Sequence, residues 1–225
     1  MNFTNNDNLF IGISEKKDGP MKSSLENRLL FFKNHNLDNK IIVSAGLVHK
    51  NSVVIVDAIN QNQLIPDCDA LITNQSKYLL AITVADCLPL YFYDTNKKII
   101  ALAHAGWRGI LSEIAKEVIK VFVGHYNSNL NDIEIFVGPH IKGCHFEVKD
   151  DVASQFKPTD YTTRDGKTFI NLSSVIKDQL LQLGINNNNI SVSEECSYCL
   201  NEKYFSYRRD KPQELETMVA YAGLK

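Results

Sequence analysis

Two apolar runs that lie close together in the sequence constrain the fold more than any other feature. Residues 79–84 (LLAITV) and 99–104 (IIALAH) contain no Asp, Glu, Lys or Arg, and both contain β-branched side chains, as is typical of strands buried on both faces. Cys87 follows the first run, and His104 ends the second. The segment 106–109 (GWRG) then holds the single tryptophan of the chain. A thiol and an imidazole at the ends of neighbouring strands predict a chemical site at one end of a buried sheet.

Length and composition indicate a globular protein with free thiols. A chain of 225 residues can bury a sizeable core, and we expect one domain over residues 1–225. Five cysteines, an odd number without regular spacing, do not indicate a disulfide framework. The formal charge of -2 gives no electrostatic reason to expect nucleic acid or an anionic membrane as a partner. No signal peptide pattern occurs in residues 1–19, and no apolar run is long enough to span a bilayer, so a cytoplasmic location is expected.

The pattern along the rest of the chain mixes strands and helices without a regular βαβ alternation. Strands are expected at residues 9–13, 41–43, 53–56, 70–73, 133–137, 190–193 and 217–221. Helices are expected at residues 25–35, 110–125, 148–156 and 171–183. The first apolar run is expected to continue as one strand through Pro89 to Tyr93. This order favours an α+β layered sandwich over a doubly wound sheet.

His49 adds a third candidate ligand to Cys87 and His104. It follows an apolar segment and precedes a strand rich in valine. One thiolate and two imidazoles form a donor set that zinc accepts, and three protein ligands leave one position open for water or substrate. The long spacings form no local motif, so two further interpretations stay open. Cys87 could be a nucleophile with His104 as its base, or Cys87 could be a small buried hydrophobe and the histidines ordinary structural residues.

Other polar segments carry weaker signals. Arg108, near the start of a predicted helix, could hold a phosphate or carboxylate, or could be an ordinary surface residue. Tyr204, Phe205 and Arg208 in the segment YFSYRRD could supply stacking rings and an anion clamp, or could form a packed turn. His35 and His125 lie at expected helix ends and are interpreted as surface residues.

Three further cysteines do not predict a second metal site. The segment 196–199 (CSYC) is a lone CxxC without a second pair at zinc-ribbon spacing. Cys144 and His145 could line a pocket, but adjacent side chains of an extended loop usually point apart.

Several of these segments occur together in one known family. TVADCLPLYFYD, ALAHAGWRG, the VH of GLVHK, DALIT, VGPHIKGCHFEV and YFSYRRD stand in the order found in the laccase-domain family. Its members have been called polyphenol oxidoreductases, purine nucleoside phosphorylases and peptidoglycan editing factors. The chain resembles this family from about residue 43 to residue 210. The resemblance implies an α/β/β/α sandwich with mixed sheets, and it places His49, Cys87 and His104 at the family's zinc-binding positions.

The resemblance also implies an activity. It is the phosphorolysis of adenosine, inosine and methylthioadenosine, with phosphate as second substrate and with adenosine deamination as a further reaction. We therefore expect a zinc-binding purine nucleoside phosphorylase. Cys87, His104 and Arg108 would act in catalysis, and Arg108, Arg208, Tyr204 and Phe205 would contact the substrate. Copper-dependent oxidation of phenols has been claimed for the family, but three ligands are fewer than a multicopper oxidase needs.

Two further functions stay open, a Cys-His hydrolase acting on cell-wall precursors and a degenerate binding module. The chain departs from the family pattern at Leu47 and Lys50, where Gln and Gly are usual, and its N-terminal segment 15–24 is short. These departures concern the substrate pocket and leave the candidate metal ligands in place. The sequence gives no indication of the oligomeric state.

Overall fold

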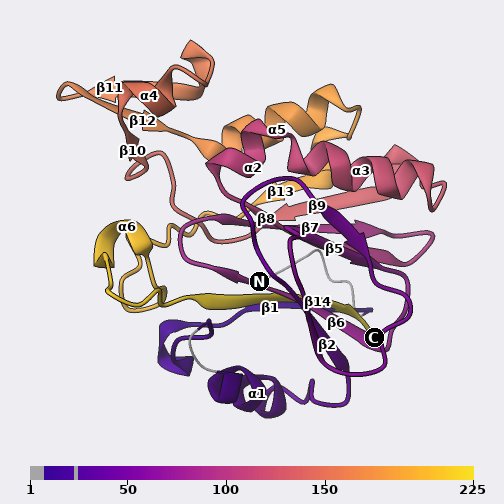
Figure 1. Cartoon of the computed structure of the whole chain (residues 1–225). Coiled ribbons are helices and arrows are strands. Elements are labelled where there is room, and N and C mark those ends of the chain that lie inside the picture. The colour runs from indigo at the N-terminus through magenta and orange to yellow at the C-terminus, as the bar shows by residue number, and fades with distance from the viewer. Residues whose placement is uncertain (1–7, 23–24) are drawn as a thin grey trace.

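Two β-sheets lie face to face between two layers of helices (Figure 1). The computed structural model describes residues 8–22 and 25–225. Residues 1–7, which belong to the segment searched for a signal peptide, and residues 23–24, which end the short segment 15–24, lie outside the described residues. The order helix, sheet, sheet, helix confirms the predicted α+β layered sandwich.

The first sheet has five strands within the described residues, in the order β1-β14-β6-β2-β4. Their bounds are Leu9–Ile13 for β1, Met218–Leu224 for β14, Tyr78–Val84 for β6, Ile41–Ala45 for β2 and Gln63–Ile65 for β4. The sheet is mixed, because β2 is parallel to β6 and β4 whereas β14 is antiparallel to β1 and β6. Helix α1 (Leu25–Asn34) covers the outer face, where Phe31 and Phe32 pack against Leu79 and Val219.

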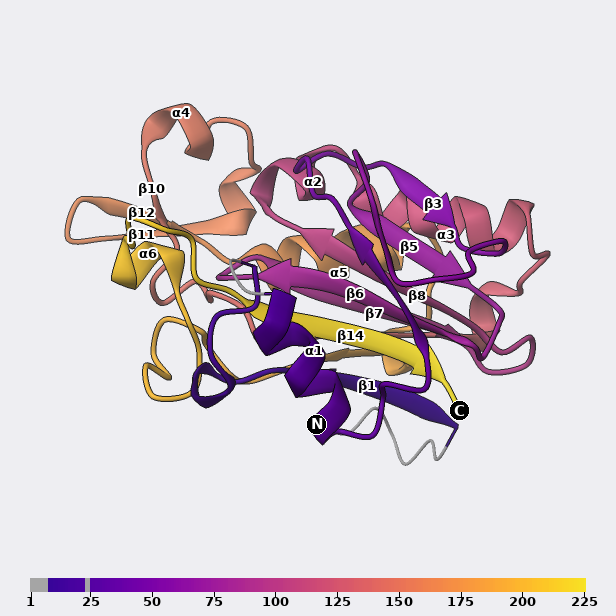
Figure 2. The ribbon, with the colours of Figure 1, turned by 60° about the horizontal axis from the view of Figure 1, so that its bottom comes forward.

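The second sheet has six strands in the described part of the chain, in the order β13-β9-β7-β8-β5-β3. Their bounds are Ile190–Val192 for β13, Ile133–Val137 for β9, Leu88–Asp94 for β7, Ile99–Ala105 for β8, Ala70–Thr73 for β5 and Val53–Ile55 for β3. Three helices, α2 (Trp107–Leu111), α3 (Ile114–Gly124) and α5 (Leu172–Gln182), cover its outer face (Figure 2). The single helix expected at residues 110–125 is thus divided, because Glu113 takes a left-handed conformation with φ of 58°.

A small third sheet projects beside these layers (Figure 1). It contains β10 (Glu147–Val148), β12 (Lys167–Ile170) and β11 (Tyr161–Arg164), and the short helix α4 (Asp150–Ala153) lies next to it. The β11–β12 hairpin turns at Asp165 and Gly166, both with positive φ, the backbone that Asp-Gly favours in two-residue hairpins. This hairpin was not among the expected strands. The last short helix, α6 (Tyr207–Asp210), leads towards β14.

Alternation along the central strands decides which layer each side chain enters. On β8, Ile100 and Leu102 pack in the core between the two sheets, whereas Ala101 and Ala103 pack under the helices. Side chains two residues apart on a strand share a face, so His104 lies on the same face as Ile100 and Leu102, the face towards the first sheet. Both faces of β8 are buried, which explains the uncharged run in the sequence.

One sequence prediction about these strands is wrong. The first apolar run does not continue as one strand through Pro89, because β6 ends at Val84 and β7 begins at Leu88 in the other sheet. An apolar run buried on both faces looks the same whether it stays in one sheet or crosses to another. The crossing places Cys87 at the junction of the two sheets. Among the described helices, none is both long and apolar enough to cross a membrane.

Candidate metal centre and adjoining pocket

Three side chains from different elements converge at the end of the interface between the sheets. His49 comes from the loop after β2, Cys87 from the turn between β6 and β7, and His104 from β8. Their ligand atoms all lie within 4.8 Å of one another, and the two imidazole rings meet edge to face with centroids 4.8 Å apart. The three residues predicted as a zinc site are therefore neighbours in space.

Asp69, buried at the start of β5, holds the two histidines of this cluster. Its carboxylate accepts backbone N–H bonds from Val48, His49 and Lys50 at 3.2, 2.8 and 2.7 Å. These bonds fix the loop in which His49 itself has a left-handed φ of 59°. The same carboxylate lies 3.5 Å from Nδ1 of His104. Asp69 thus faces the imidazole of His104, as carboxylates commonly do behind metal-bound histidines, and holds His49 through its backbone.

Asp86 holds the turn that carries Cys87. Its φ is 84°, which a non-glycine residue adopts only when neighbouring interactions enforce it. The carboxylate accepts hydrogen bonds from the hydroxyls of Ser197 and Ser206 at 2.6 and 3.0 Å and from the backbone N–H of Arg208 at 2.7 Å. The position of Cys87 therefore depends on segments more than a hundred residues away in the sequence.

The electrostatics of the cluster favour an added positive charge. Burial alone would lower the pKa of His104, but the Cys87 sulfur and the Asp69 carboxylate raise it to about 9. Burial would raise the pKa of Asp69, yet its hydrogen bonds from His104, Lys50 and His49 lower it below the usual range. A cluster in which His104 is buried and His49 is exposed, and which gathers a sulfur and a carboxylate around two imidazoles, has the donor chemistry and the charge for a divalent cation. The residues present therefore fit a metal ion.

Gly106 leaves the space in which these ligands meet. A Cβ atom at this position would lie 3.1 Å from Sγ of Cys87, 3.6 Å from His49 and 3.7 Å from His104. The first of these contacts is tighter than ordinary van der Waals packing. The glycine before Trp107 in the sequence therefore lets the backbone approach the cluster closely.

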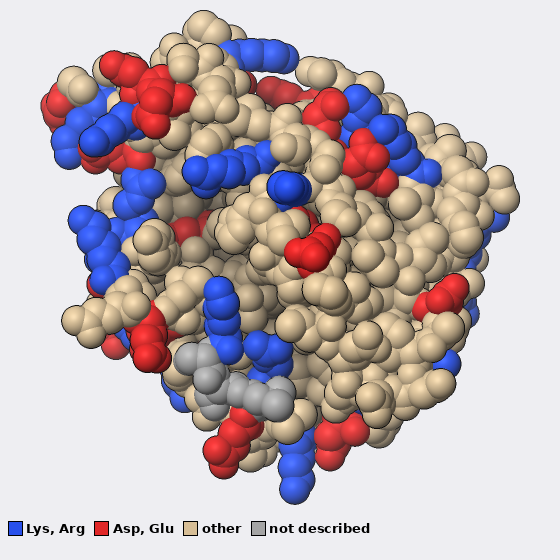
Figure 3. Space-filling view, in the orientation of Figure 1, with Lys and Arg blue, Asp and Glu red and all other residues tan. Residues whose placement is uncertain are grey.

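The cluster opens on a pocket of about 830 Å³ that lies against the first sheet. This volume is in the range of small-molecule sites. The wall combines the three ligands with cations, an aromatic ring and apolar side chains, and its residues include Lys22, Arg28, Leu47, Leu64, Ala81, Ile82, Tyr207, Leu215 and Val219. Lys and Arg side chains border the hollow on the face that Figure 3 shows.

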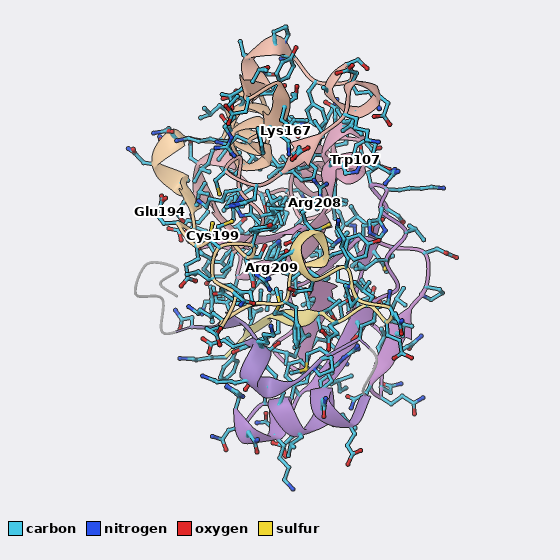
Figure 4. All side chains as sticks on the ribbon, turned by 90° about the vertical axis from the view of Figure 1, so that its left-hand side faces the viewer. Trp107, Lys167, Glu194, Cys199, Arg208 and Arg209 are labelled. Atoms are coloured by element: carbon cyan, nitrogen blue, oxygen red, sulfur yellow. The ribbon has the colours of Figure 1, made fainter. Side chains whose placement is uncertain are left out.

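The other residues predicted for substrate binding take different positions. Arg108 is exposed, with its guanidinium 4.2 Å from the Trp107 ring centroid, and its charge is close enough to contribute to the lowered pKa of His49, after burial and His104. Arg208, which is labelled in Figure 4, donates to the carbonyl of Glu147 and lies over the Phe146 ring. Neither arginine is among the residues that line the pocket. Their roles in catalysis and binding stay predictions.

The two predicted aromatic contacts are buried. Tyr204 and Phe205 are 1% and 4% exposed and do not line this pocket, whereas Tyr207 of the same segment is 59% exposed and does. Ser206 caps α6, and Tyr207 begins this short helix with its ring exposed; the sequence motif alone did not indicate which ring would face the pocket. Sequence reasoning also did not single out Asp69, Lys22 and Arg28. Lys22 lies in the short segment 15–24, and Arg28 lies in the helix expected at residues 25–35.

A second group of sulfur and nitrogen atoms lies elsewhere in the fold. Cys144, His145, Cys196 and Cys199 bring one ligand atom each to within 4.8 Å of the others. The expectation that Cys144 and His145 point apart is wrong, because their loop is a tight turn in which the N–H groups of His145 and Phe146 both donate to the carbonyl of Lys142. The turn therefore brings a thiol and an imidazole, those of Cys144 and His145, next to the two thiols of the CxxC.

Comparison with known proteins places the chain among bacterial relatives. The chain is 34% identical over 167 residues to a protein of Geobacillus stearothermophilus named purine nucleoside phosphorylase YlmD, a match that covers 71% of this chain but only 61% of that relative. It is 35% identical over 200 residues to a Staphylococcus aureus protein named purine nucleoside phosphorylase SACOL1200, covering 83% of this chain and 74% of the relative.

Solved structures share the fold over nearly the whole length. The crystal structure of YlmD from Geobacillus stearothermophilus superposes with a TM-score of 0.89 at 26% identity, covering 97% of this chain and 93% of that one. That of the Bacillus licheniformis hypothetical protein YfiH gives 0.88 at 26% identity, covering 96% and 93%. Residues 12–225 match the family model described as multi-copper polyphenol oxidoreductase laccase. The chain therefore belongs to this laccase-domain family.

Proposed function

We propose that this chain is a zinc-binding purine nucleoside phosphorylase that cleaves adenosine, inosine or methylthioadenosine with phosphate, with adenosine deamination as a second reaction. The observation that carries the proposal is the position of the cluster of His49, Cys87 and His104. It lies in the wall of a pocket that also holds two cationic side chains. Relatives at 34% and 35% identity are named purine nucleoside phosphorylases, which supports the same class of reaction. We place the enzyme in the cytoplasm.

The pocket offers the groups that phosphorolysis needs. Arg28 and Lys22 supply positive charge for a phosphate, and the Arg28 guanidinium is oriented by hydrogen bonds to the carbonyl of Met21 at 2.7 and 3.1 Å. Tyr207, largely exposed, offers a ring on which a purine can stack, and Leu47 and Leu64 add apolar surface. Arg108 is proposed to stabilise negative charge near His49.

Phosphorolysis develops positive charge on the sugar and negative charge on the leaving base. When bound, a zinc ion supplies Lewis-acid polarisation and lowers the pKa of a water ligand towards ~7. The lowered pKa of the water suits deamination, because deamination needs a water-derived nucleophile. Asp69 orients His49 and His104, and Asp86 orients Cys87. The donor set contains one thiolate and two imidazoles, and soft sulfur with imidazole suits zinc and copper alike. We propose zinc because three ligands with one open position are the usual catalytic zinc arrangement.

The experiment follows release of hypoxanthine from inosine in the presence and absence of phosphate. We expect phosphate-dependent release by the wild-type chain and a loss of about a thousandfold or more in Cys87→Ala, since metal polarisation contributes several kcal/mol and 1.36 kcal/mol is tenfold in rate. Cys68→Ser is the matched control, because Cys68 donates to the carbonyl of Ile65 outside both clusters and serine keeps that bond. Absence of phosphate-dependent release, or full activity in Cys87→Ala, would contradict the proposal.

A second candidate function rests on the position of His104 between a thiol and a carboxylate. His104 lies between Cys87 and Asp69, the order of groups in a Cys-His-acid hydrolase. In that case His49 would be dispensable and the purified chain would hold no metal at this cluster. Metal analysis of His49→Ala together with amide hydrolysis assays separates the two candidates. A metal-free His49→Ala that keeps hydrolytic activity would favour the hydrolase.

A further inference from the structure

The cluster of Cys144, His145, Cys196 and Cys199 has no part in the proposed reaction. It joins two long connections that contain little regular structure. Cys144 and His145 lie between β9 and β10, and Cys196 and Cys199 lie between β13 and α6. The two connections meet in an isolated parallel bridge between His140 and Cys196, in which the Ser197 N–H donates to the carbonyl of His140 at 3.0 Å. In Figure 4, Cys199 and Arg209 both lie on the part of the chain that runs from β13 into α6.

The distances within this cluster match those of a tetrahedral zinc site. Sγ of Cys144 lies 3.7 Å from Sγ of both Cys196 and Cys199, and Nδ1 of His145 lies 3.2 Å from Sγ of Cys144 and 3.3 Å from Sγ of Cys199. With Zn–S bonds of about 2.3 Å and a Zn–N bond of about 2.0 Å, tetrahedral geometry puts sulfurs about 3.8 Å apart and sulfur and nitrogen about 3.5 Å apart. A disulfide would need sulfurs at about 2.05 Å, and all three cysteines are free.

We propose that Cys144, His145, Cys196 and Cys199 bind a second zinc ion in a closed, structural site. Three thiolates and one imidazole complete tetrahedral coordination, so no position is left for water or substrate. The motif combines a CxxC, common in structural zinc sites, with a Cys-His pair from a turn. The site ties the 140–147 connection to the 193–206 connection where backbone pairing alone is sparse.

The surroundings fit the charge of such a site. A divalent zinc ion with three thiolates carries a net negative charge, and the guanidinium groups of Arg164 and Arg209 lie nearby, the second of them paired with the carboxylate of Asp210. Arg164 donates to the backbone carbonyl of Cys144, and Arg209 donates to the carbonyls of Ser197 and Tyr198 at 2.9 and 2.8 Å. The His145 ring is held in place by stacking on Tyr198, with centroids 4.0 Å apart and planes at 13°. The donor nitrogen is thereby directed at the sulfurs, and a stacked ring with a fixed orientation is what a ligand position requires.

The second site is connected to the turn that carries Cys87 through contacts with Asp86. Ser197, inside the CxxC, donates its hydroxyl to the buried carboxylate of Asp86 at 2.6 Å, and Asp86 directly precedes Cys87. The backbone N–H of Ile141 donates to the carbonyl of Asp86 at 3.0 Å, so the other connection reaches the same turn. The zinc at the second site therefore acts as a positioning element for the turn that carries Cys87, without touching the pocket residues.

The test counts zinc per chain after purification without added metal. We expect two equivalents in the wild-type chain, one in Cys87→Ser, one in the double variant Cys144→Ser/Cys199→Ser, and two in the control Cys68→Ser. A wild-type chain with at most one equivalent, lost entirely in Cys87→Ser, would overturn the proposal. So would a disulfide that forms between two of the three cluster cysteines even when zinc is supplied.

Cobalt(II) provides a readout that does not depend on the double variant folding. In Cys87→Ser, one equivalent of Co²⁺ should give visible bands of tetrahedral cobalt and a strong near-ultraviolet thiolate-to-cobalt band, because the three remaining ligand sulfurs belong to the second cluster. Zn²⁺ should displace the cobalt and abolish both bands. Absence of thiolate-to-cobalt absorption in a folded Cys87→Ser would contradict the second site. Neither measurement involves nucleoside cleavage, so failure of the proposed activity leaves this test intact.

Discussion

The two Cys/His clusters of this chain use the same kinds of ligand in opposite settings. The cluster of His49, Cys87 and His104 has three ligand residues and lies in the wall of a large pocket. The cluster of Cys144, His145, Cys196 and Cys199 has four and lies against two loops and a stacked tyrosine. Ligand number and access to a pocket, rather than ligand type, distinguish a site suited to chemistry from a site suited to holding loops together.

The supporting residues differ as well. The first cluster rests on buried carboxylates, Asp69 behind the histidines and Asp86 behind the cysteine. The second has two guanidinium groups beside its backbone, that of Arg164 and that of Arg209, which is also paired with Asp210. A site with a single thiolate has little negative charge, so nearby carboxylates strengthen its binding of a cation. A site with three thiolates has excess negative charge, which nearby arginines offset. The comparison therefore predicts that the two metals respond differently to the same treatments.

Graded chelation should produce the largest difference. A moderate chelator is expected to remove zinc from the three-ligand cluster first and to abolish nucleoside cleavage, while the second zinc and the folded structure remain. The reason is that three ligands and an open position release metal more easily than four ligands in a closed site. Zinc per chain, activity and thermal unfolding, followed on the same samples, provide the measurement. Readdition of zinc should restore activity, and simultaneous loss of both metals would show that the two sites are not distinct in the way proposed.

Asp69→Asn should affect one cluster only. We expect zinc affinity at the first cluster to fall about 10–100-fold, because an amide cannot match the carboxylate that faces the His104 ring and holds the backbone of the His49 loop, while the second zinc is retained. Competition with a chromogenic chelator measures both sites. Asp94→Asn is the matched control, since Asp94 is equally buried and caps a turn through the N–H groups of Asn96 and Lys97. Equal loss of zinc in both variants would remove the assigned role of Asp69.

Arg28→Gln should have the smallest effect of these changes. It compares an arginine in the wall of the pocket with an arginine beside the second cluster. We expect the KM for phosphate to rise about tenfold with zinc content unchanged, since one charge-assisted contact is worth about 1.5–3 kcal/mol at most in this partly open pocket. The control Arg164→Gln removes an arginine beside the second cluster and should leave the phosphate KM as in the wild type. A rise of the same size in both variants would indicate general electrostatics rather than a contact with phosphate.

Much of the fold was accessible from residue patterns. The strands expected at residues 9–13, 70–73 and 133–137 coincide with β1, β5 and β9, and α3 lies within the helix expected at residues 110–125. Local periodicity decides such elements, because it reports which faces are buried. The β11–β12 hairpin was missed although its Asp-Gly turn is a recognisable signal. Periodicity could not show that the first apolar run changes sheets at Asp86, since both halves are equally buried.

Residue patterns alone were enough to predict the layered class of fold and, through family resemblance, the trio of His49, Cys87 and His104. Tertiary packing was needed to show that Asp69 faces His104 and holds the loop of His49, that Tyr207 rather than Tyr204 faces the pocket, and that a CxxC meets a distant Cys-His pair. The physical reason is the same in each case. These relations join residues tens to more than a hundred positions apart, and the packing of two sheets and their connecting loops, not any local pattern, brings them together.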